Sequence, residues 1–295
     1  MAVPGTDERL GVDAPDHQLV VPISDEQLRE QSSAFVAGGL TAGEQVSYFD
    51  DGTADDVLER LTDDGVDTVE PLRTGQLQVV PPDVTRSALD ARPDQLGGIL
   101  DGSVDAALEA GWRGLRFTGD LVRGLEPPGG PLEEVDGVVD RVVRDRPARV
   151  LCVYDRARFP PWLIDRMRAL HTREVPDDSV YDDGLLRITR GRAGVARLAG
   201  EIDQSNRQQV RRVLEPMRTE TLRAASGPVD LVLDLGSLRF VDVATAVSVV
   251  HAAEEMPSSH RLVLTGVRPG LVRTLERCGS AAASQLDVRA RRDRG

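Results

Sequence analysis

The sequence predicts an α/β protein of two domains, a larger N-terminal one built on a parallel sheet and a smaller C-terminal one with a mixed sheet. Up to about residue 175, short apolar runs alternate with longer amphipathic runs, a pattern typical of strands joined by helical crossovers. A polar, acidic, proline-broken segment, TREVPDDSVYDDG, follows at 172–184 and indicates a domain boundary. Beyond it the order of elements changes and begins with a hairpin pattern, which places antiparallel strands in the second sheet.

The N-terminal elements alternate regularly along the chain. We expect strands at 17–23, 44–49, 76–80, 114–119 and 148–154, and helices at 24–40, 53–61, 96–111, 133–145 and 160–170. Ser24 is suited to cap the first helix and Gly38-Gly39 to end it, because serine oxygens accept first-turn N–H groups and glycine tolerates left-handed backbone. Thr53 is suited to cap the second helix.

The C-terminal elements begin with LLRITR and VARLAG, which are separated by GRAG and predict a hairpin. A long helix is expected within 200–225, with Pro216 kinking or interrupting it. Further strands are expected at 229–235 and 261–266, and further helices at 245–256 and 269–279. The predicted organisation is a disordered N-terminus at 1–16, domains at 17–175 and 184–280, a linker at 176–183 and a flexible tail at 281–295.

Composition limits the possible functions. There are 36 basic and 49 acidic residues, a net charge of -13, which is the wrong sign for coating phosphate backbones, so no direct nucleic-acid partner is expected. The chain contains no lysine and so lacks the residue that grips phosphate in a P-loop. Its two cysteines are far apart in sequence, which favours a reducing compartment and predicts no metal site. No signal peptide or membrane span is apparent, so we expect a cytoplasmic protein without a cofactor.

The second half resembles the STAS domain of anti-sigma factor antagonists over roughly residues 183–280. The most specific matches are Gly200–Asp203, the DLGSLRFVD segment from Asp234 to Asp242, and the strand exit from Leu264 to Pro269. The resemblance implies binding to an anti-sigma factor, often a histidine-kinase-like ATPase that acts as a protein kinase. In this family the partner phosphorylates a serine two residues after the aspartate that ends the strand, and the added charge breaks the complex.

Here Asp242 matches the family aspartate, but Ala244 stands at the position of the phosphorylated serine. Alanine accepts no phosphate, so the usual switch is predicted to be missing, unless the neighbouring Thr245 is the phosphoacceptor. Asp242 is also suited simply to cap the following helix. The resemblance places Asp203 and Asn206 beside the partner-binding surface, although both are equally suited to a turn at a helix start.

The first half resembles the MEDS sensory domain, known from a dichloromethane-responsive repressor, over about residues 16–175. The matching segments are HQLVVPI, FVAGGLTAGEQVSYF, GWRGLRFTGD and VLCVYDRARF, with His171 following the last helix. This resemblance implies a RecA-like or KaiC-like α/β fold and a role in sensing hydrocarbon derivatives. No P-loop accompanies it, because the glycine-rich GGLTAGE lies between a helix and a strand and there is no lysine.

His17, Arg116, Cys152 and Tyr154 are expected at or near strand ends, where open α/β sheets bind ligands. They are our candidates for a sensory pocket that takes a small apolar molecule. Each also has a structural interpretation: Cys152 lies between Leu151 and Val153 and suits a small core residue, and His17 suits the start of a strand. The spacing of His, Cys and Tyr supports neither a metal site nor a nucleophile.

The sequence therefore predicts a non-enzymatic regulator that senses a small molecule in one domain and binds an anti-sigma factor or related switch protein with the other. A ligand-driven change in domain packing would replace phosphorylation as the switch. Two alternatives stay open. One is a non-catalytic scaffold of a stress-sensing assembly, and the other is a degenerate RecA-like ATPase, which the missing lysine disfavours.

Overall fold

A computed structural model describes residues 16–49, 54–119, 132–192, 194–223 and 230–291. The chain forms two compact units with their boundary between Pro176 and Asp177, inside the acidic segment that the sequence marks as a boundary. The predicted disordered residues up to 15 and the predicted cap Thr53 lie outside the described residues.

The N-terminal unit alternates strands and helices along the chain. Its elements are β1 (Asp16–Val20), α1 (Asp25–Ala42), β2 (Gln45–Phe49), α2 (Ala54–Asp63), α3 (Val69–Thr74), β3 (Leu77–Val80), α4 (Pro82–Leu89), α5 (Pro93–Glu109), β4 (Leu115–Gly119), α6 (Leu132–Asp145), β5 (Ala148–Val153), α7 (Pro161–Leu170) and β6 (Arg173–Glu174). The six strands pair in the order β3-β2-β4-β5-β1-β6 and every pairing is parallel.

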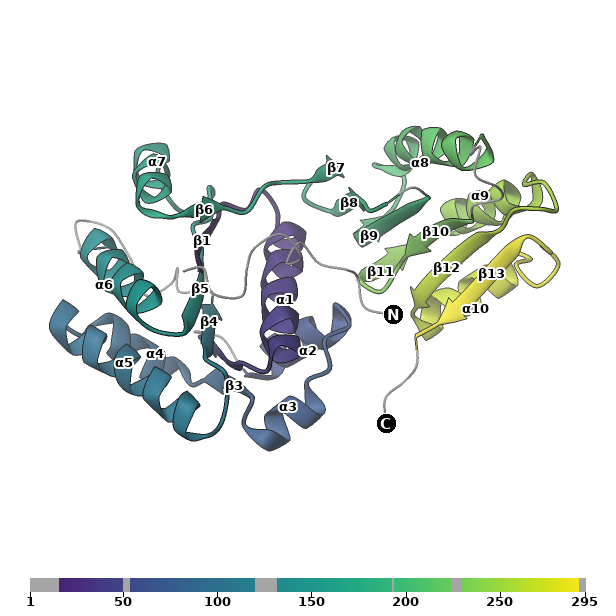
Figure 1. Ribbon diagram of the computed structural model, residues 1–295. Helices are drawn as coiled ribbons and strands as arrows, with labels where there is room; N and C mark the ends of the chain where they lie inside the picture. The colour runs from purple at the N-terminus through teal and green to yellow at the C-terminus, as the bar shows by residue number, and fades with distance from the viewer. Residues whose placement is uncertain (1–15, 50–53, 120–131, 193, 224–229, 292–295) are drawn as a thin grey trace. The chain divides into compact units, whose positions relative to one another are not determined.

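Helices cover both faces of this sheet (Figure 1). Val46 and Tyr48 of β2 pack under α1 and α2, whereas Leu115 and Phe117 of β4 pack under α5 and α6 on the opposite face. Leu19 of β1 packs with α7 on that second face. The expected all-parallel α/β architecture is therefore confirmed, and the two faces hold separate sets of side chains.

Helix α1 begins where the sequence predicts and ends later. The Ser24 side chain accepts a hydrogen bond from the Gln27 amide at 3.1 Å, which confirms the predicted cap. The prediction that Gly38-Gly39 ends the helix is wrong. The helix continues to Ala42 and ends at Gly43, whose φ of 75° is the left-handed conformation that closes a helix.

The C-terminal unit contains β7 (Ser179–Asp182), β8 (Leu186–Arg190), β9 (Val195–Ile202), α8 (Arg207–Leu222), β10 (Leu231–Asp234), β11 (Leu238–Val241), α9 (Val243–Glu254), β12 (Leu262–Val267), α10 (Pro269–Arg277) and β13 (Leu286–Ala290). The strand order is β13-β12-β10-β9-β8-β7, and β11 also pairs with β9. The β8–β9 hairpin and the β7–β8 pair are antiparallel and the other pairings are parallel. The predicted mixed sheet is thus confirmed.

Three features of this unit differ from the sequence-based expectation. Of the kink or interruption expected at Pro216, the interruption does not occur, since α8 continues through this residue although proline cannot donate the hydrogen bond of that turn. Residues 179–182, expected in the linker, form β7 against β8. Residues 286–290, expected in a flexible tail, form β13 along β12, so the sheet extends beyond residue 280.

Fully buried Arg187 explains why the acidic segment joins the second sheet. Its guanidinium lies 2.9 Å from an Asp177 carboxylate oxygen, 3.1 Å from Asp182 and 3.4 Å from Asp178. A buried guanidinium without partners is costly, and these carboxylates compensate it. The acidic segment that the sequence predicts as a linker therefore supplies the carboxylates that neutralise the buried guanidinium of Arg187.

Candidate functional site

The predicted partner-binding residues of the C-terminal unit lie at the starts of α8 and α9. Asp242 caps α9 by accepting a hydrogen bond from the Thr245 amide at 2.7 Å, and it also forms an ion pair with Arg207 at the start of α8. Partial burial opposes ionisation of Asp242, but the hydrogen bonds from Arg207 and Thr245 lower its pKa. One charged carboxylate therefore ties the two helix starts together.

Ala244 and Thr245 differ sharply in exposure. Ala244 is exposed, whereas Thr245 is 4% exposed and its Oγ1 is buried with no hydrogen-bond partner in the described residues. A kinase needs an accessible hydroxyl, and the one beside Ala244 points into the protein. Sequence analysis missed the exposed apolar residues around this point, namely Phe240, Val243 and Val247.

Asp203 and Asn206 lie in the loop between β9 and α8. Asn206 is completely buried; its side chain accepts from the Asp203 amide at 3.1 Å and donates to the Glu201 carbonyl at 3.0 Å. Asp203 accepts hydrogen bonds from the amide and hydroxyl of Ser205, which lower its pKa. Asn206 thus shapes the loop from inside, while Asp203 lies at its surface.

In the N-terminal unit, three of the four predicted pocket residues come together. Cys152 Sγ of β5 lies 3.6 Å from Nε2 of His17 in β1, and the Tyr154 hydroxyl donates to Oδ1 of Asp136 in α6 at 3.3 Å. His171 joins them, with its ring centre 4.1 Å from that of His17. One ligating atom from each of His17, Asp136, Cys152 and His171 falls within 4.8 Å of all the others. We call these four residues the His–Cys–Asp cluster.

Burial governs ionisation in this cluster. Burial, followed by the neighbouring His171, lowers the pKa of His17 to about 4, against the opposing effect of Asp140. Burial and the Asp136 carboxylate raise the pKa of the Cys152 thiol well above its usual value, and burial also raises the pKa of Asp136. A low-dielectric site disfavours charge, so burial favours the neutral imidazole of His17 and the thiol of Cys152.

Arg116 lies on the other face of the sheet. Its guanidinium pairs with Glu44 at 2.5 Å, donates to the Phe35 carbonyl at 3.0 Å and lies 4.9 Å from the centre of the Phe35 ring. Glu44 also pairs with Arg149 at 3.2 Å. Arg116 therefore links Phe35 of α1 and Glu44, which follows α1, to the sheet, and the structure does not bring it to the other three predicted residues.

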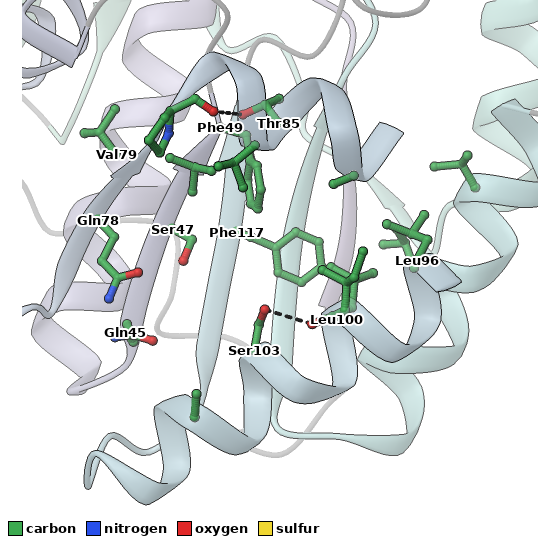
Figure 2. A pocket seen from close by; sticks show the side chains of 18 of the residues that line it. Gln45, Ser47, Phe49, Gln78, Val79, Thr85, Leu96, Leu100, Ser103 and Phe117 are labelled. Carbon is green, nitrogen blue, oxygen red and sulfur yellow. Dashed lines mark hydrogen bonds between the residues drawn. The ribbon is translucent and has the colours of Figure 1, made fainter. Parts of the chain in front are cut away.

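A cavity of about 600 Å³ opens between β2, β3 and β4 and the helices α4, α5 and α6 (Figure 2). Figure 2 shows the polar side chains of Gln45, Ser47 and Gln78 on one side and the apolar Phe117, Leu96 and Leu100 on another. None of the described residues that line it is charged; besides these six they are Phe49, Val79, Val80, Pro81, Val84, Thr85, Ala88, Ile99, Ser103, Ala106, Ala110, Val135 and Val139.

Sequence analysis did not predict this cavity, and none of the four predicted pocket residues lines it. One signal was available in β2. Gln45, Ser47 and Phe49 alternate onto one face of a strand whose other face carries Val46 and Tyr48. A strand covered on both faces is expected to be apolar on both, so polar residues on one face indicate a site that is not simply core.

In the N-terminal unit the cavity and the His–Cys–Asp cluster lie on the same face of the sheet, and α6 contributes to both. Val135 and Val139 line the cavity, while Asp136 belongs to the cluster and Asp140 faces His17 Nδ1 at 3.5 Å. No helix in the described residues is long and apolar enough to cross a membrane.

Comparisons with known proteins agree with both resemblances. The model of the MEDS family, described as "MEthanogen/methylotroph, DcmR Sensory domain", matches residues 16–172, and the STAS domain model matches residues 187–287. No curated protein matches the chain. A solved structure, the flagellar accessory protein FlaH from Methanocaldococcus jannaschii, is similar with 11% identity and a TM-score of 0.42, covering 62% of this chain and 78% of that one. The chain belongs to the MEDS family and continues into a STAS domain.

Proposed function

We propose that this protein is a cytoplasmic, non-catalytic signalling regulator whose MEDS domain binds an uncharged, largely apolar small molecule in the cavity beneath α4 and α5. Its STAS domain binds an anti-sigma factor of the kinase type or a related switch protein. Ligand occupancy, in place of serine phosphorylation, sets the affinity for that partner. The observation that carries the proposal is the cavity of about 600 Å³, a volume in the range of small-molecule sites.

The cavity lining restricts the chemistry of the ligand. Apolar side chains from β4, α4, α5 and α6 form most of the wall, and burying apolar surface there supplies the binding free energy. A charged group would lose its hydration without meeting an opposite charge in the described lining, at a cost of several kcal/mol. Gln45, Ser47 and Gln78 instead provide neutral hydrogen-bonding groups for one polar end of the ligand.

The STAS surface supports a switch without phosphate. Ala244 is exposed where the family carries its phosphorylated serine, and Thr245 is buried. Phe240, Val243 and Val247 are 50%, 65% and 38% exposed, and Val243 and Val247 lie one turn apart on the same face of α9, an arrangement that suits an apolar contact. A STAS domain of this kind can bind its partner at all times, because no phosphate blocks the surface. Its affinity is then set by ligand binding in the MEDS domain.

Because the lining that the structure describes carries no charged residue, neutral ligands are expected to bind in the cavity more tightly than charged ligands of the same length. In calorimetry with the full-length protein, 1-octanol should bind at least about tenfold more tightly than octanoate, because the carboxylate loses hydration without a counter-charge. Ser103 lines the cavity from α5, so Ser103→Trp should abolish octanol binding by filling the space. Leu108→Trp is the control on the same helix, because Leu108 is exposed and does not line the cavity. Equal binding to the two tryptophan variants would contradict the assignment of the site.

The partner is tested separately. Protein immobilised with and without octanol is used to capture partners from native cytosol, followed by mass spectrometry and a search for phosphate within 238–261. We expect a histidine-kinase-like ATPase among the captured proteins, in an amount that changes with octanol, and an unmodified Thr245. Recovery that is indifferent to octanol would contradict the coupling, and phosphate on Thr245 would contradict the absence of the usual switch.

Two other functions are weaker. A scaffold would form large particles of defined size, which light scattering detects. A residual ATPase is disfavoured by the β1–α1 connection, which reads Val21-Pro22-Ile23-Ser24 and has no glycine, whereas a P-loop cradles phosphate with glycine-rich backbone between a strand and a helix.

A further inference from the structure

The His–Cys–Asp cluster contains two residue types, histidine and cysteine, that are rare in this chain. The sequence has four histidines and two cysteines, and the cluster holds two of those histidines and one cysteine although they are as far as 154 residues apart, from His17 to His171. Four separate elements, β1, α6, β5 and the end of α7, deliver the residues. Such convergence of ligating side chains is typical of a site, not of a generic core.

Three buried polar atoms of the cluster, His17 Nδ1, His171 Nε2 and Asp136 Oδ2, have no hydrogen-bond partner in the described part of the chain. The His171 and Asp136 side chains are 1% and 4% exposed, and Oδ2 of Asp136 lies 3.6 Å from Nδ1 of His171. Buried polar atoms are nearly always paired in folded proteins. A cation held by the four residues would give buried ligating atoms of this kind a partner.

The second nitrogen of His171 is hydrogen-bonded, and that of His17 faces a carboxylate without a hydrogen bond. Nδ1 of His171 lies 2.8 Å from the Met167 carbonyl, which leaves Nε2 as the lone-pair nitrogen when Nδ1 donates. Nδ1 of His17 lies 3.5 Å from the Asp140 carboxylate, and its Nε2 faces Cys152. Metal-bound histidines characteristically direct the other ring nitrogen to a carbonyl or a carboxylate in this way.

The spacing of the ligating atoms fits a tetrahedral ion. Bonds of about 2.0–2.3 Å to zinc place neighbouring ligand atoms about 3.3–3.8 Å apart. Cys152 Sγ lies 3.6 Å from His17 Nε2 and 3.9 Å from Asp136 Oδ1, and the widest separation in the set is within 4.8 Å. Contraction of about an ångström at the widest pair is sufficient to close the shell.

We propose that His17, Asp136, Cys152 and His171 bind one zinc ion in the MEDS domain. Two imidazoles, a thiolate and a carboxylate favour a borderline-soft tetrahedral ion over magnesium or calcium, which prefer oxygen ligands. The thiolate and the carboxylate also balance the two positive charges, so the occupied site is neutral and burial costs less. Tyr154, which donates to Asp136, orients that carboxylate.

A nucleophilic function for the same atoms fits less well. Cys152, His17 and Asp140 lie in the order of nucleophile, base and orienting carboxylate. However, burial raises the pKa of the Cys152 thiol, whereas an activated cysteine has a lowered one. Zinc requires no prior ionisation, because metal binding itself displaces the thiol proton.

The test uses the reduced, chelator-treated full-length protein titrated with Zn²⁺ against a chromophoric chelator, and then with Co²⁺ as a spectroscopic probe. We expect one ion per chain, a higher melting temperature with Zn²⁺, and a Co²⁺ spectrum that shows tetrahedral geometry and a thiolate-to-metal charge-transfer band. Cys152→Ser should remove that band and weaken Zn²⁺ binding at least about 100-fold, and Asp140→Asn should weaken it about 10- to 100-fold through the orientation of His17.

The chain offers matched controls in its second unit. Cys278→Ser and His251→Gln replace the same residue types outside the cluster and should leave stoichiometry, affinity and the Co²⁺ spectrum unchanged. If Cys152→Ser fails to fold, the charge-transfer band in Cys278→Ser alone still assigns the thiolate to Cys152. Absence of ion binding by the wild-type protein, or loss of the band in Cys278→Ser, would overturn the proposal. Neither readout involves the cavity ligand or the STAS partner.

Discussion

Replacing Ala244 with aspartate is expected to weaken the complex of the STAS domain with its partner about 10- to 100-fold. Ala244 is exposed in the first turn of α9, two residues after the cap Asp242. A carboxylate there repeats the charge change that phosphorylation produces in the family, and it must lose hydration when the partner docks. The fold itself should tolerate the change, because negative charge near a helix N-terminus is favourable.

The measurement is the Kd for the partner kinase recovered from cytosol, with Ala282→Asp as the control. Ala282 is exposed beyond the end of α10. This variant therefore adds the same charge to the domain, but outside the proposed partner-binding residues at the start of α9. Ala244→Ser provides the complementary experiment, since it should accept phosphate at residue 244 from the partner and ATP, and then dissociate. Unchanged affinity of Ala244→Asp would show that the partner docks elsewhere.

Replacing Gly200 with alanine is expected to destabilise the STAS domain by about 2–6 kcal/mol, a large part of the stability of a domain of this size. Gly200 has a φ of 104°, and a Cβ there would lie 2.1 Å from the Leu185 carbonyl oxygen. The backbone atoms it would meet belong to the start of β8, while Gly200 itself pairs with both Leu186 and Leu238. Neither strand is free to move away, so the strain is retained.

Hydrogen exchange of the β9 and α8 amides measures this effect within the full-length protein. Gly270→Ala is the control in the same domain, because nothing lies within 4 Å of a Cβ at that position and alanine favours helix. The chain has two tryptophans, Trp112 and Trp162, both in the N-terminal unit, so their fluorescence should be unchanged. Protection equal to wild type in Gly200→Ala would contradict the role of the glycine.

The order of strands and helices was predictable from the spacing of apolar residues along the chain. That spacing shows which side chains are buried and differs between a helix and a strand. The hairpin was predictable for the same reason. β13 was missed, because LDVRA is a short strand with as many charged as strongly apolar residues; Leu286 and Val288 nevertheless pack against the core beside β12. Helices α3 and α4 were also missed, since they are short and each contains or begins with a proline.

The candidate sites were predictable only in part. His17, Cys152 and Tyr154 were selected as strand-end residues, and the structure places them together. Their remaining neighbours, Asp136 and His171, depend on how α6 and α7 pack on the sheet, which no local pattern encodes. Arg116 was selected by the same argument, but consecutive residues of a strand face opposite sides, and its side chain lies under α1.

Helix α6 has a thermodynamic consequence for both proposed sites. Val135 and Val139 face the cavity, and Asp136 and Asp140 face the zinc ligands, so two adjacent stripes of one helix serve two ligands. By linkage, any cavity ligand that displaces this turn changes zinc affinity by the same factor by which zinc changes the affinity of that ligand. Zinc affinity measured with and without octanol therefore reports the effect of the cavity ligand on α6 within the MEDS domain. This measurement requires no knowledge of the STAS partner.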